Sequence, residues 1–353
     1  MQKPLIHIMP NCCGPHSGHA NASRQYWRRA LLGFLALAGI LYSSLVAAQS
    51  APKASGQSSL AARATVSPII SPAELKALID RKSVRVLDIR EVFQNDGKTP
   101  NYAAGHIPGA ISAPYSAFRG PDSNPGSLLS DAKLSGLFNK WGLATESHIV
   151  IAPTGSDATD FGGAARVYWT LKLAGFQRLS ILEGGLGAWL ALKYPTETTT
   201  PAIVATKLEF KLDRSQVVTT NELAELIKSS TGGGRKFTLT DSRSEDFFSG
   251  KERHSVAARA GTIPSATNFD HEEWFQINTS KLLPKAQLES LAKNAGLLAT
   301  GDVISFCNTG HWSATTWFVL SEVLGKKNVR MYPESAIGWS RSRNPMANEP
   351  AKK

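Results

Sequence analysis

Short runs of apolar, often β-branched residues alternate along the chain with amphipathic stretches of helical period. Three of these runs are typical of buried strands: 84–87, 148–152 and 179–182. Three helical patterns lie among them: 72–79 behind Ser71, 132–140, and 164–174 ending at Gly175. Because strands and helices alternate, we predict an α/β fold whose mostly parallel sheet is covered by helices on both faces.

The second half of the chain repeats the pattern of the first half. Four pairs carry the repeat: 86–90 with 239–243, 105–110 with 261–266, Ala152 with Cys307, and Trp189 with Trp339. Helical patterns recur at 220–227 behind Thr219, 285–295 and 313–324. The offset falls from 155 residues at Ala152 to 150 at Trp189, which places a five-residue insertion after Gly155. We therefore predict two similar domains in tandem.

The repeat and the Thr/Pro-rich stretch between its halves define the predicted domain organisation. In chain order we expect a signal peptide at 1–48, a disordered tether at 49–66, an N-terminal domain at 67–195, a linker at 196–206, a C-terminal domain at 207–345 and a tail at 346–353.

The N-terminal segment has the pattern of a secretory signal. Arg28 and Arg29 precede an apolar run, and small residues end it at Ala48 before a polar stretch. We expect cleavage after Ala48 and a periplasmic or secreted protein without stable membrane insertion. The alternative is an uncleaved anchor, because the run is about long enough to span a bilayer.

Removing the leader changes both charge and cysteine content. It takes away four cations and no acid, so the net charge falls from +11 to +7, and Cys12 and Cys13 leave with it. The remaining charge forms no long basic run, which fits a small anionic substrate better than nucleic acid. Cys307 is then the remaining cysteine, which excludes an internal disulfide framework, a CxxC redox motif and a thiolate metal site.

Cys307 ends a predicted strand and is followed by a short loop and a helix start. This is the edge where ligands bind in open α/β sheets. Backbone N–H groups at a helix start favour an anion, so a thiolate there is stabilised as a nucleophile. The predicted cradle consists of Asn308, Thr309, Gly310, His311, Trp312 and Ser313. The alternative is a buried structural cysteine, since free cysteine is among the most buried residue types.

Together these segments resemble the tandem-domain rhodanese family of thiosulfate and 3-mercaptopyruvate sulfurtransferases. The resemblance rests on 87–90, 105–110, 182–189 and the Cys307 loop, and it extends over roughly residues 68–342. It implies two rhodanese-like domains, of which the first is inactive because Ala152 replaces the cysteine. It also implies that Cys307 takes sulfur from an anionic donor as a persulfide and passes it to cyanide or a thiol. No metal or organic cofactor is implied, and we expect a monomer.

The choice of donor is left open by departures from the family pattern. Asn308 follows the cysteine, where thiosulfate enzymes have Arg and mercaptopyruvate enzymes have Gly. Because the loop contains no Lys or Arg, the cations for a donor must come from elsewhere. Arg253 and Arg259 lie where the family places a carboxylate-binding Arg, but they are equally consistent with solvated surface charges. Phe247 replaces a second such Arg, which argues against mercaptopyruvate.

Two loop residues have open roles. His311 could supply a switchable positive charge beside the sulfur or guide proton transfer, or it could pack or cap the helix. Trp312 could shield the site or stack on an acceptor, or it could simply pack.

Other repeated residues are interpreted as structural. The pairs Asp88/Arg90 and Asp241/Arg243 are expected to form strand-end salt bridges, and Trp189 and Trp339 to lie in the core. The resemblance gives His106 a structural role.

Two other functions compete with the sulfurtransferase interpretation. A cysteine phosphatase needs an Arg six residues after the cysteine, where this chain has Ser313, and is excluded. A non-catalytic exported sulfur carrier or binding module stays open, because the loop lacks cations and contains His311 and Trp312.

Overall fold

The structure is a computed structural model that describes residues 66–94, 96–230 and 237–351. The predicted signal peptide (1–48) and all but the last residue of the predicted tether (49–66) lie outside the described residues. Among the residues that are described, no helix is both long and apolar enough to cross a membrane.

The N-terminal domain is built on a parallel sheet that has five strands within the described residues, in the order β1-β5-β4-β2-β3. The strands are β1 (Ile69–Ile70), β2 (Arg85–Asp88), β3 (Ile111–Ser112), β4 (Ile149–Ala152) and β5 (Leu179–Leu182). The helices are α1 (Pro72–Asp80), α2 (Asp131–Lys140), α3 (Ala158–Leu173) and α4 (Gly185–Ala191). A 3₁₀ helix spans Tyr115–Phe118.

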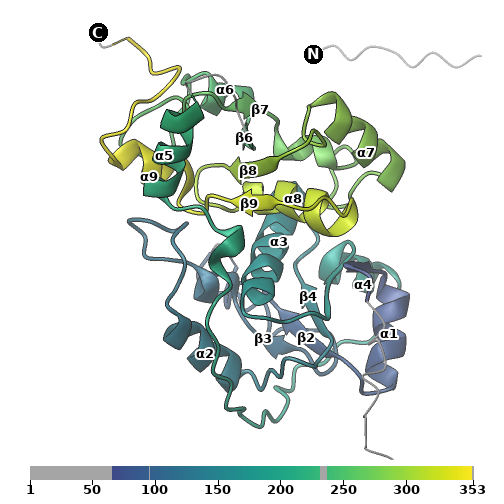
Figure 1. The fold of residues 1–353 in the computed structure, drawn as a ribbon. Coiled ribbons are helices and arrows are strands. Elements are labelled where there is room, and N and C mark those ends of the chain that lie inside the picture. Colours follow the sequence, from purple (N-terminus) through teal and green to yellow (C-terminus); the bar gives the residue numbers. More distant parts are fainter. Residues whose placement is uncertain (1–65, 95, 231–236, 352–353) are drawn as a thin grey trace, which may run out of the picture. The chain divides into compact units, whose positions relative to one another are not determined.

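The C-terminal domain repeats this plan with a four-stranded parallel sheet in the described part of the chain, in the order β7-β6-β8-β9. The strands are β6 (Phe237–Asp241), β7 (Thr267–Asn268), β8 (Asp302–Phe306) and β9 (Val329–Met331). The helices are α5 (Thr220–Ser230), α6 (Glu245–Phe248), α7 (Lys285–Asn294), α8 (Trp312–Phe318) and α9 (Ser335–Arg341). Two 3₁₀ helices span Arg214–Gln216 and His271–Trp274. The predicted fold class is confirmed: each domain is a parallel sheet flanked by helices (Figure 1).

Local sequence signals explain where the helices begin. Ser71 caps α1 in a reciprocal capping box with Glu74, and Pro72 occupies the first helical position. Ser130 caps α2 through the N–H of Lys133. The prediction for α3 was wrong at its start, because Asp157 caps this helix and it begins at Ala158, six residues before the apolar pattern at 164.

Most of the five extra residues in the first half lie within a helix. Helix α3 has 16 residues, whereas α8 has seven and continues as a five-residue π-helical turn at Val319–Val323. The predicted helix at 313–324 is therefore not uniformly α-helical. The longer α3 gives the first domain a buried face that runs along α8.

Three apolar clusters occupy the two faces of the sheets. The cluster around Leu75 and Trp189 lies under α1 and α4, and the one around Leu223 and Trp339 lies under α5 and α9. The third contains residues of α2, α3, α7 and α8, so it is shared by both domains. Helices α3 and α8 meet within it, where Phe161 and Phe318 have ring centroids 5.6 Å apart (Figure 1).

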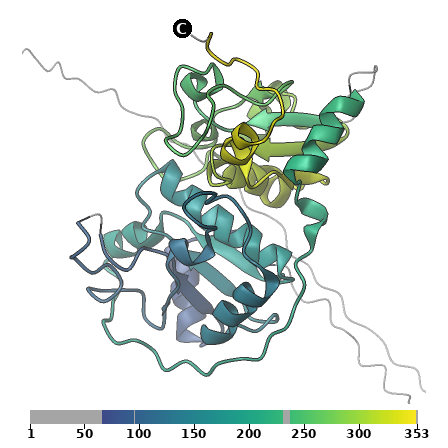
Figure 2. The same cartoon turned by 90° about the vertical axis from the view of Figure 1, so that its left-hand side faces the viewer.

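The segment that joins the domains contains no helix or strand between α4 and the 3₁₀ turn at 214, and Figure 2 shows it running around the first domain. It is fixed there by polar contacts. The N–H of Thr206 donates to the Asn139 carbonyl, and the N–H of Asp213 donates to the Leu173 carbonyl. The joining segment is thus hydrogen-bonded to α2 and to the end of α3.

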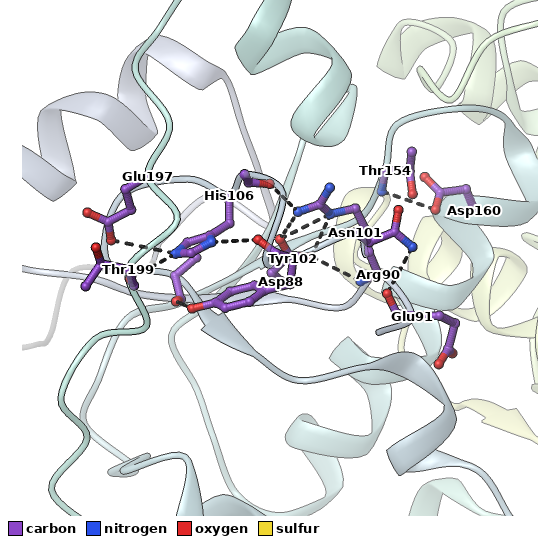
Figure 3. A network of polar contacts seen from close by, with 12 residues as sticks. Asp88, Arg90, Glu91, Asn101, Tyr102, His106, Thr154, Asp160, Glu197 and Thr199 are labelled. Atoms are coloured by element: carbon purple, nitrogen blue, oxygen red, sulfur yellow. Dashed lines mark hydrogen bonds and ion pairs between the residues drawn. The ribbon is translucent and has the colours of Figure 1, made fainter. Parts of the chain in front are cut away.

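The predicted strand-end salt bridges are confirmed in both domains. Arg90 and Asp88 form an ion pair of 2.6 Å, and Arg243 and Asp241 form another of 2.6 Å. In each domain the arginine also donates to the carbonyl of a loop glycine at 2.9 Å, as Figure 3 shows around Arg90. His106 is buried in the same network and stacks on Tyr102, consistent with a structural role.

Candidate active site

Cys307 lies directly after β8, at the carboxyl edge of the C-terminal sheet. Its loop leads into α8, whose first turn has no side-chain cap. The thiol is 1% exposed, as a structural cysteine would be, yet Cys307 belongs to none of the three apolar clusters. Cys307 thus precedes the α8 start by a short loop, and the N–H groups of a helix start have the polarity that an anion requires.

Ser335, the first residue of α9, fixes the Cys307 loop by hydrogen bonds to two of its N–H groups. Its Oγ accepts hydrogen bonds from the N–H of Cys307 at 3.1 Å and of Gly310 at 3.0 Å, and it donates to the Tyr332 carbonyl at 2.9 Å. Ser335 is fully buried and has φ +55°, a left-handed conformation that disfavours residues with a side chain. The first residue of α9 is thus kept in a strained conformation at the point where it fixes the loop.

Two arginines of the N-terminal domain donate hydrogen bonds to carbonyls of the Cys307 loop. Nη2 of Arg119 donates to the Thr309 carbonyl at 2.9 Å. Nη1 of Arg166 donates to the Gly310 carbonyl at 3.1 Å, while its Nη2 donates to the Gly126 carbonyl at 2.9 Å. Both arginines keep a buried N–H without a hydrogen-bond partner, namely Nη1 of Arg119 and Nε of Arg166.

Arg166 is a buried cation whose acidic neighbours are a phenol and a thiol, those of Tyr115 and Cys307. It is fully buried within α3, and within the described chain it forms no ion pair with a carboxylate. Burial and the nearby Arg119 lower the pKa of Arg166 to about 9, whereas the Tyr115 hydroxyl and the Cys307 thiol oppose this shift. The guanidinium is still charged at neutral pH, and negative charge on Cys307 would compensate it.

His311 connects the loop to the first domain through both ring nitrogens. Nε2 lies 2.6 Å from the Thr159 carbonyl, and Nδ1 lies 2.8 Å from the Tyr115 hydroxyl. A carbonyl can only accept, so Nε2 carries the proton and Nδ1 accepts from Tyr115. Burial, with Arg119 as the next cause, lowers the pKa of His311 to about 3. The low pKa argues against a switchable positive charge on this ring, and His311 occupies the N-cap position of α8 without a capping hydrogen bond from its side chain.

Trp312 is packed among aromatic side chains beside the loop. It stacks on His271 with ring centroids 4.7 Å apart, and it meets Phe247 edge to face at 6.2 Å. Its Nε1 donates to the Thr159 hydroxyl at 3.1 Å. Trp312 therefore forms a wall of the loop region and links it to the start of α3.

The remaining loop residues are fixed within the C-terminal domain. The Asn308 side chain accepts from Nη1 of Arg243 at 3.3 Å, and its carbonyl accepts from the N–H of Ile337 at 3.2 Å. Ser313 is fully buried, and its hydroxyl has no hydrogen-bond partner. The structure thus places Asn308, Thr309, Gly310 and His311 in the loop that follows Cys307 and Trp312 and Ser313 in the first turn of α8, and their role as a persulfide cradle stays a prediction.

The two arginines that the sequence offered as donor-binding groups lie elsewhere. Arg253 is exposed and its Nη1 donates to the Ala257 carbonyl. Arg259 donates to three carbonyls at the end of α9, those of Ser340, Ser342 and Asn344. The other end of α9 is the one that contacts Cys307, and their roles in substrate binding remain predictions.

Sequence reasoning did not identify the residues that reach the loop from other elements, which are Tyr115, Arg119, Thr159, Arg166 and Ser335. Arg166 was visible as a cation surrounded by apolar residues in the first turns of the helical pattern at 164–174. The pair Gly162 and Gly163 was a second signal, because a Cβ on Gly162 would lie 2.9 Å from Cδ2 of His311.

No group of three His, Cys, Asp or Glu side chains within the described residues is arranged to hold a metal ion.

Two parallel α/β domains in tandem, with one cysteine at the carboxyl edge of the second sheet, define the class of this protein. The chain belongs to the rhodanese family: the Rhodanese-like domain matches residues 71–192 and 219–342. A putative thiosulfate sulfurtransferase of Synechococcus elongatus is 28% identical over 299 residues, covering 82% of this chain and 88% of the relative. A thiosulfate sulfurtransferase of Pseudomonas aeruginosa is 28% identical over 274 residues, covering 77% and 93%.

Solved structures share the fold at lower identity. The 3-mercaptopyruvate sulfurtransferase SseA of Escherichia coli has a TM-score of 0.64 at 20% identity, covering 76% of this chain and 99% of that one. The anaerobic ergothioneine biosynthesis enzyme of Chlorobium limicola has a TM-score of 0.66 at 18% identity, covering 79% and 69%.

Proposed function

We propose that this protein is a sulfurtransferase that carries a sulfane sulfur on Cys307 as a persulfide. The donor is a small anion, with thiosulfate as the first choice and 3-mercaptopyruvate as the second, and the acceptor is cyanide or a thiol. The names of the relatives support the general activity. The persulfide is argued from the surroundings of Cys307, and the acceptors from the membership of the rhodanese family.

The observation that carries the proposal is the buried Arg166. A guanidinium without a carboxylate partner costs free energy unless another negative charge compensates it. The acidic groups that interact with Arg166 are the hydroxyl of Tyr115 and the thiol of Cys307. Burial raises the pKa of Tyr115, so the phenol does not supply a negative charge. The Trp169 ring lies 4.8 Å from the guanidinium and stabilises it in part, and a persulfide on Cys307 would supply the compensating charge.

The chemistry has two displacement steps. The Cys307 thiolate attacks the outer sulfur of thiosulfate; a new S–S bond forms as the donor's S–S bond breaks, and the electron pair leaves on sulfite. The outer sulfur of the persulfide is then attacked by cyanide or a thiolate, and Cys307 leaves as a thiolate. Both forms of Cys307 are anions, so the amide groups of the α8 start and the two arginines stabilise each of them.

Arg119 supplies a cation for the donor that the loop itself lacks. Its Nη2 is occupied by the Thr309 carbonyl, but its Nη1 is buried without a partner. A donor oxygen at this position would satisfy that N–H. We place Arg119 ahead of Arg253 and Arg259 as a donor-binding group, because Arg259 is held by carbonyls at the far end of α9.

Intact-mass measurement tests the proposal. Incubation with thiosulfate is expected to add the mass of one sulfur atom to the wild type and nothing to Cys307→Ala. No added mass in the wild type, or the same addition in Cys307→Ala, overturns the proposal. Initial rates with thiosulfate and with 3-mercaptopyruvate then identify the preferred donor, and Arg119→Met is expected to raise donor KM more than it lowers kcat.

The alternative is a non-catalytic sulfur carrier or binding module, which the near-complete burial of Cys307 favours. In that case the persulfide would form but would not pass to cyanide or thiols in repeated turnovers. Steady-state release of thiocyanate from thiosulfate and cyanide distinguishes an enzyme from a carrier.

Export of the protein is a further part of the proposal and rests on the leader sequence alone. N-terminal sequencing of the protein recovered from fractionated cells is expected to begin at Gln49 in the periplasmic or secreted fraction. A chain that starts upstream of Ala30 and stays with the membrane would instead establish an uncleaved anchor.

A further inference from the structure

The first domain contains a loop that corresponds to the Cys307 loop, and a carboxylate is bound to this loop. It follows Ala152 at the end of β4 and leads into α3, just as the Cys307 loop follows β8 and leads into α8. The difference lies in the third residue of each helix, which is Asp160 in α3 and Ala314 in α8.

The Asp160 carboxylate occupies the place that an anion would take in this loop. It accepts hydrogen bonds from three successive N–H groups, those of Thr154 at 3.2 Å, Gly155 at 2.5 Å and Ser156 at 3.3 Å. Its own N–H donates to the capping residue Asp157 at 2.9 Å. Figure 3 shows the Asp160 side chain turned back toward Thr154. The first domain therefore retains a cradle for an anion and fills it with a carboxylate of its own.

The filled cradle contacts the catalytic domain at three points. The Thr159 carbonyl accepts from Nε2 of His311, and the Thr159 hydroxyl accepts from Nε1 of Trp312. The Gly155 carbonyl accepts from the buried hydroxyl of Ser280 at 3.0 Å. Thr159 directly precedes Asp160 in the chain. A shift of the Asp160 carboxylate would therefore also move the Thr159 carbonyl and hydroxyl, to which His311 and Trp312 donate.

We propose that Asp160 is a positioning residue for the Cys307 loop, acting from the other domain as an internal anion. Its carboxylate holds residues 154–156 and the first turn of α3 in one shape, and Thr159 then fixes His311 and Trp312 at the correct distance from Cys307. The first domain, which has Ala152 in place of the cysteine, thus uses the corresponding loop as a support for the Cys307 loop. The inference rests on the proposed function only in treating Cys307 as the reactive group.

Removal of the carboxylate and its replacement from solution test this role. Asp160→Ala is expected to slow persulfide formation about 10- to 100-fold, the size of effect that misplacement by about 1 Å produces. Sodium formate, compared with sodium chloride at equal ionic strength, is expected to restore the rate with saturation, because formate fits the vacated N–H groups. Asp160→Asn still fills the space and is expected to be impaired without rescue. Asp160→Ser replaces Asp160→Ala if the latter does not fold.

A matched control and a double-mutant cycle separate positioning from general stability. Asp96 accepts from two N–H groups and one hydroxyl in an exposed loop of the same domain, and Asp96→Ala is expected to leave the rate unchanged. In a His311→Ala background, the cost of Asp160→Ala is expected to shrink, because the contact that it acts through is already lost.

The rate of Cys307 alkylation by iodoacetamide provides a second readout that needs no sulfur donor. Wild-type protein that alkylates but forms no persulfide would refute the proposed function without affecting the role of Asp160. A normal alkylation rate and normal sulfur transfer in Asp160→Ala, or a slow rate that formate and chloride change equally, would overturn the role of Asp160.

Discussion

The Oγ atom of Ser335 lies 3.1 Å from the backbone nitrogen of Cys307 and accepts its hydrogen bond. Ser335 has φ +55°, and its counterpart in the first domain, Gly185, has the same value. Only glycine fits at position 185, because a Cβ there would lie 2.4 Å from the Pro153 carbonyl oxygen. The second domain keeps a side chain in the unfavourable conformation, and that side chain supplies the hydroxyl that fixes the Cys307 loop.

Substitution of Ser335 should separate stability from activity. Ser335→Ala and Ser335→Gly both leave the N–H groups of Cys307 and Gly310 without an acceptor, so both are expected to lose at least about tenfold in turnover. The glycine variant should be more stable than the alanine variant by about 1 kcal/mol, because it relieves the left-handed strain. Denaturant unfolding and steady-state kinetics measure the two effects, and equal stability of the two variants would show that the conformation carries no strain.

Replacement of the buried Arg166 should weaken the thiolate form of Cys307. Arg166→Met removes the charge and the contact with the Gly310 carbonyl, and persulfide formation should slow by about tenfold or more. Overall stability should fall, because the buried Gly310 and Gly126 carbonyls lose their donor. Single-turnover kinetics and denaturant unfolding measure both quantities. Lys133→Met removes an exposed cation of α2 and serves as the control; a loss of rate in that variant as large as in Arg166→Met would point to net charge instead.

The glycine pair of α3 should tolerate no side chain at its first position. A Cβ on Gly162 would lie 2.9 Å from Cδ2 and 3.0 Å from Nε2 of His311. Gly162→Ala is therefore expected to displace the loop and to lower activity, despite the higher helix propensity of alanine. Gly136→Ala in α2 meets no atom within 4 Å and is expected to stabilise the protein by about 0.5–1 kcal/mol with unchanged activity. Unchanged activity in Gly162→Ala would mean that His311 can move without consequence.

The depressed pKa of His311 should appear in the pH dependence of stability. The folded pKa of about 3 lies below the ordinary value near 6.5, so the unfolded chain binds the proton more readily between these values. Stability is present in full above about pH 6.5 and is lost as the pH falls toward 3. Between pH 7.5 and 5 the wild type should lose about 2 kcal/mol more than His311→Gln. Equal losses in urea unfolding would contradict a ring that stays neutral in the folded protein.

The pH–rate profile gives an independent check of the same residue. Because His311 is neutral throughout the range in which the enzyme is assayed, its protonation should produce no step near pH 6.5. A step near pH 6.5 that disappears in His311→Gln would show that the ring titrates in the active protein.

The sequence by itself determined the fold class, the repeat and the position of the cysteine. Apolar runs of four or five residues predicted β2, β4 and β5 to within a residue at either end, because buried strands need continuous apolar side chains. The strand-end salt bridges were predictable because Asp and Arg recur at the same place in both halves. Cys307 was placed at the sheet edge because the strand and helix patterns around it are local.

Only the tertiary structure decided which groups surround the cysteine. Arg119, Arg166 and Tyr115 reach the loop from the other domain, across 144 to 196 positions of sequence. Local periodicity carries no information about such distances, and Arg253 and Arg259 looked equally suitable on charge alone. The charge of His311 was likewise undecided by the sequence, because a pKa depends on the desolvation and on the partners that folding supplies.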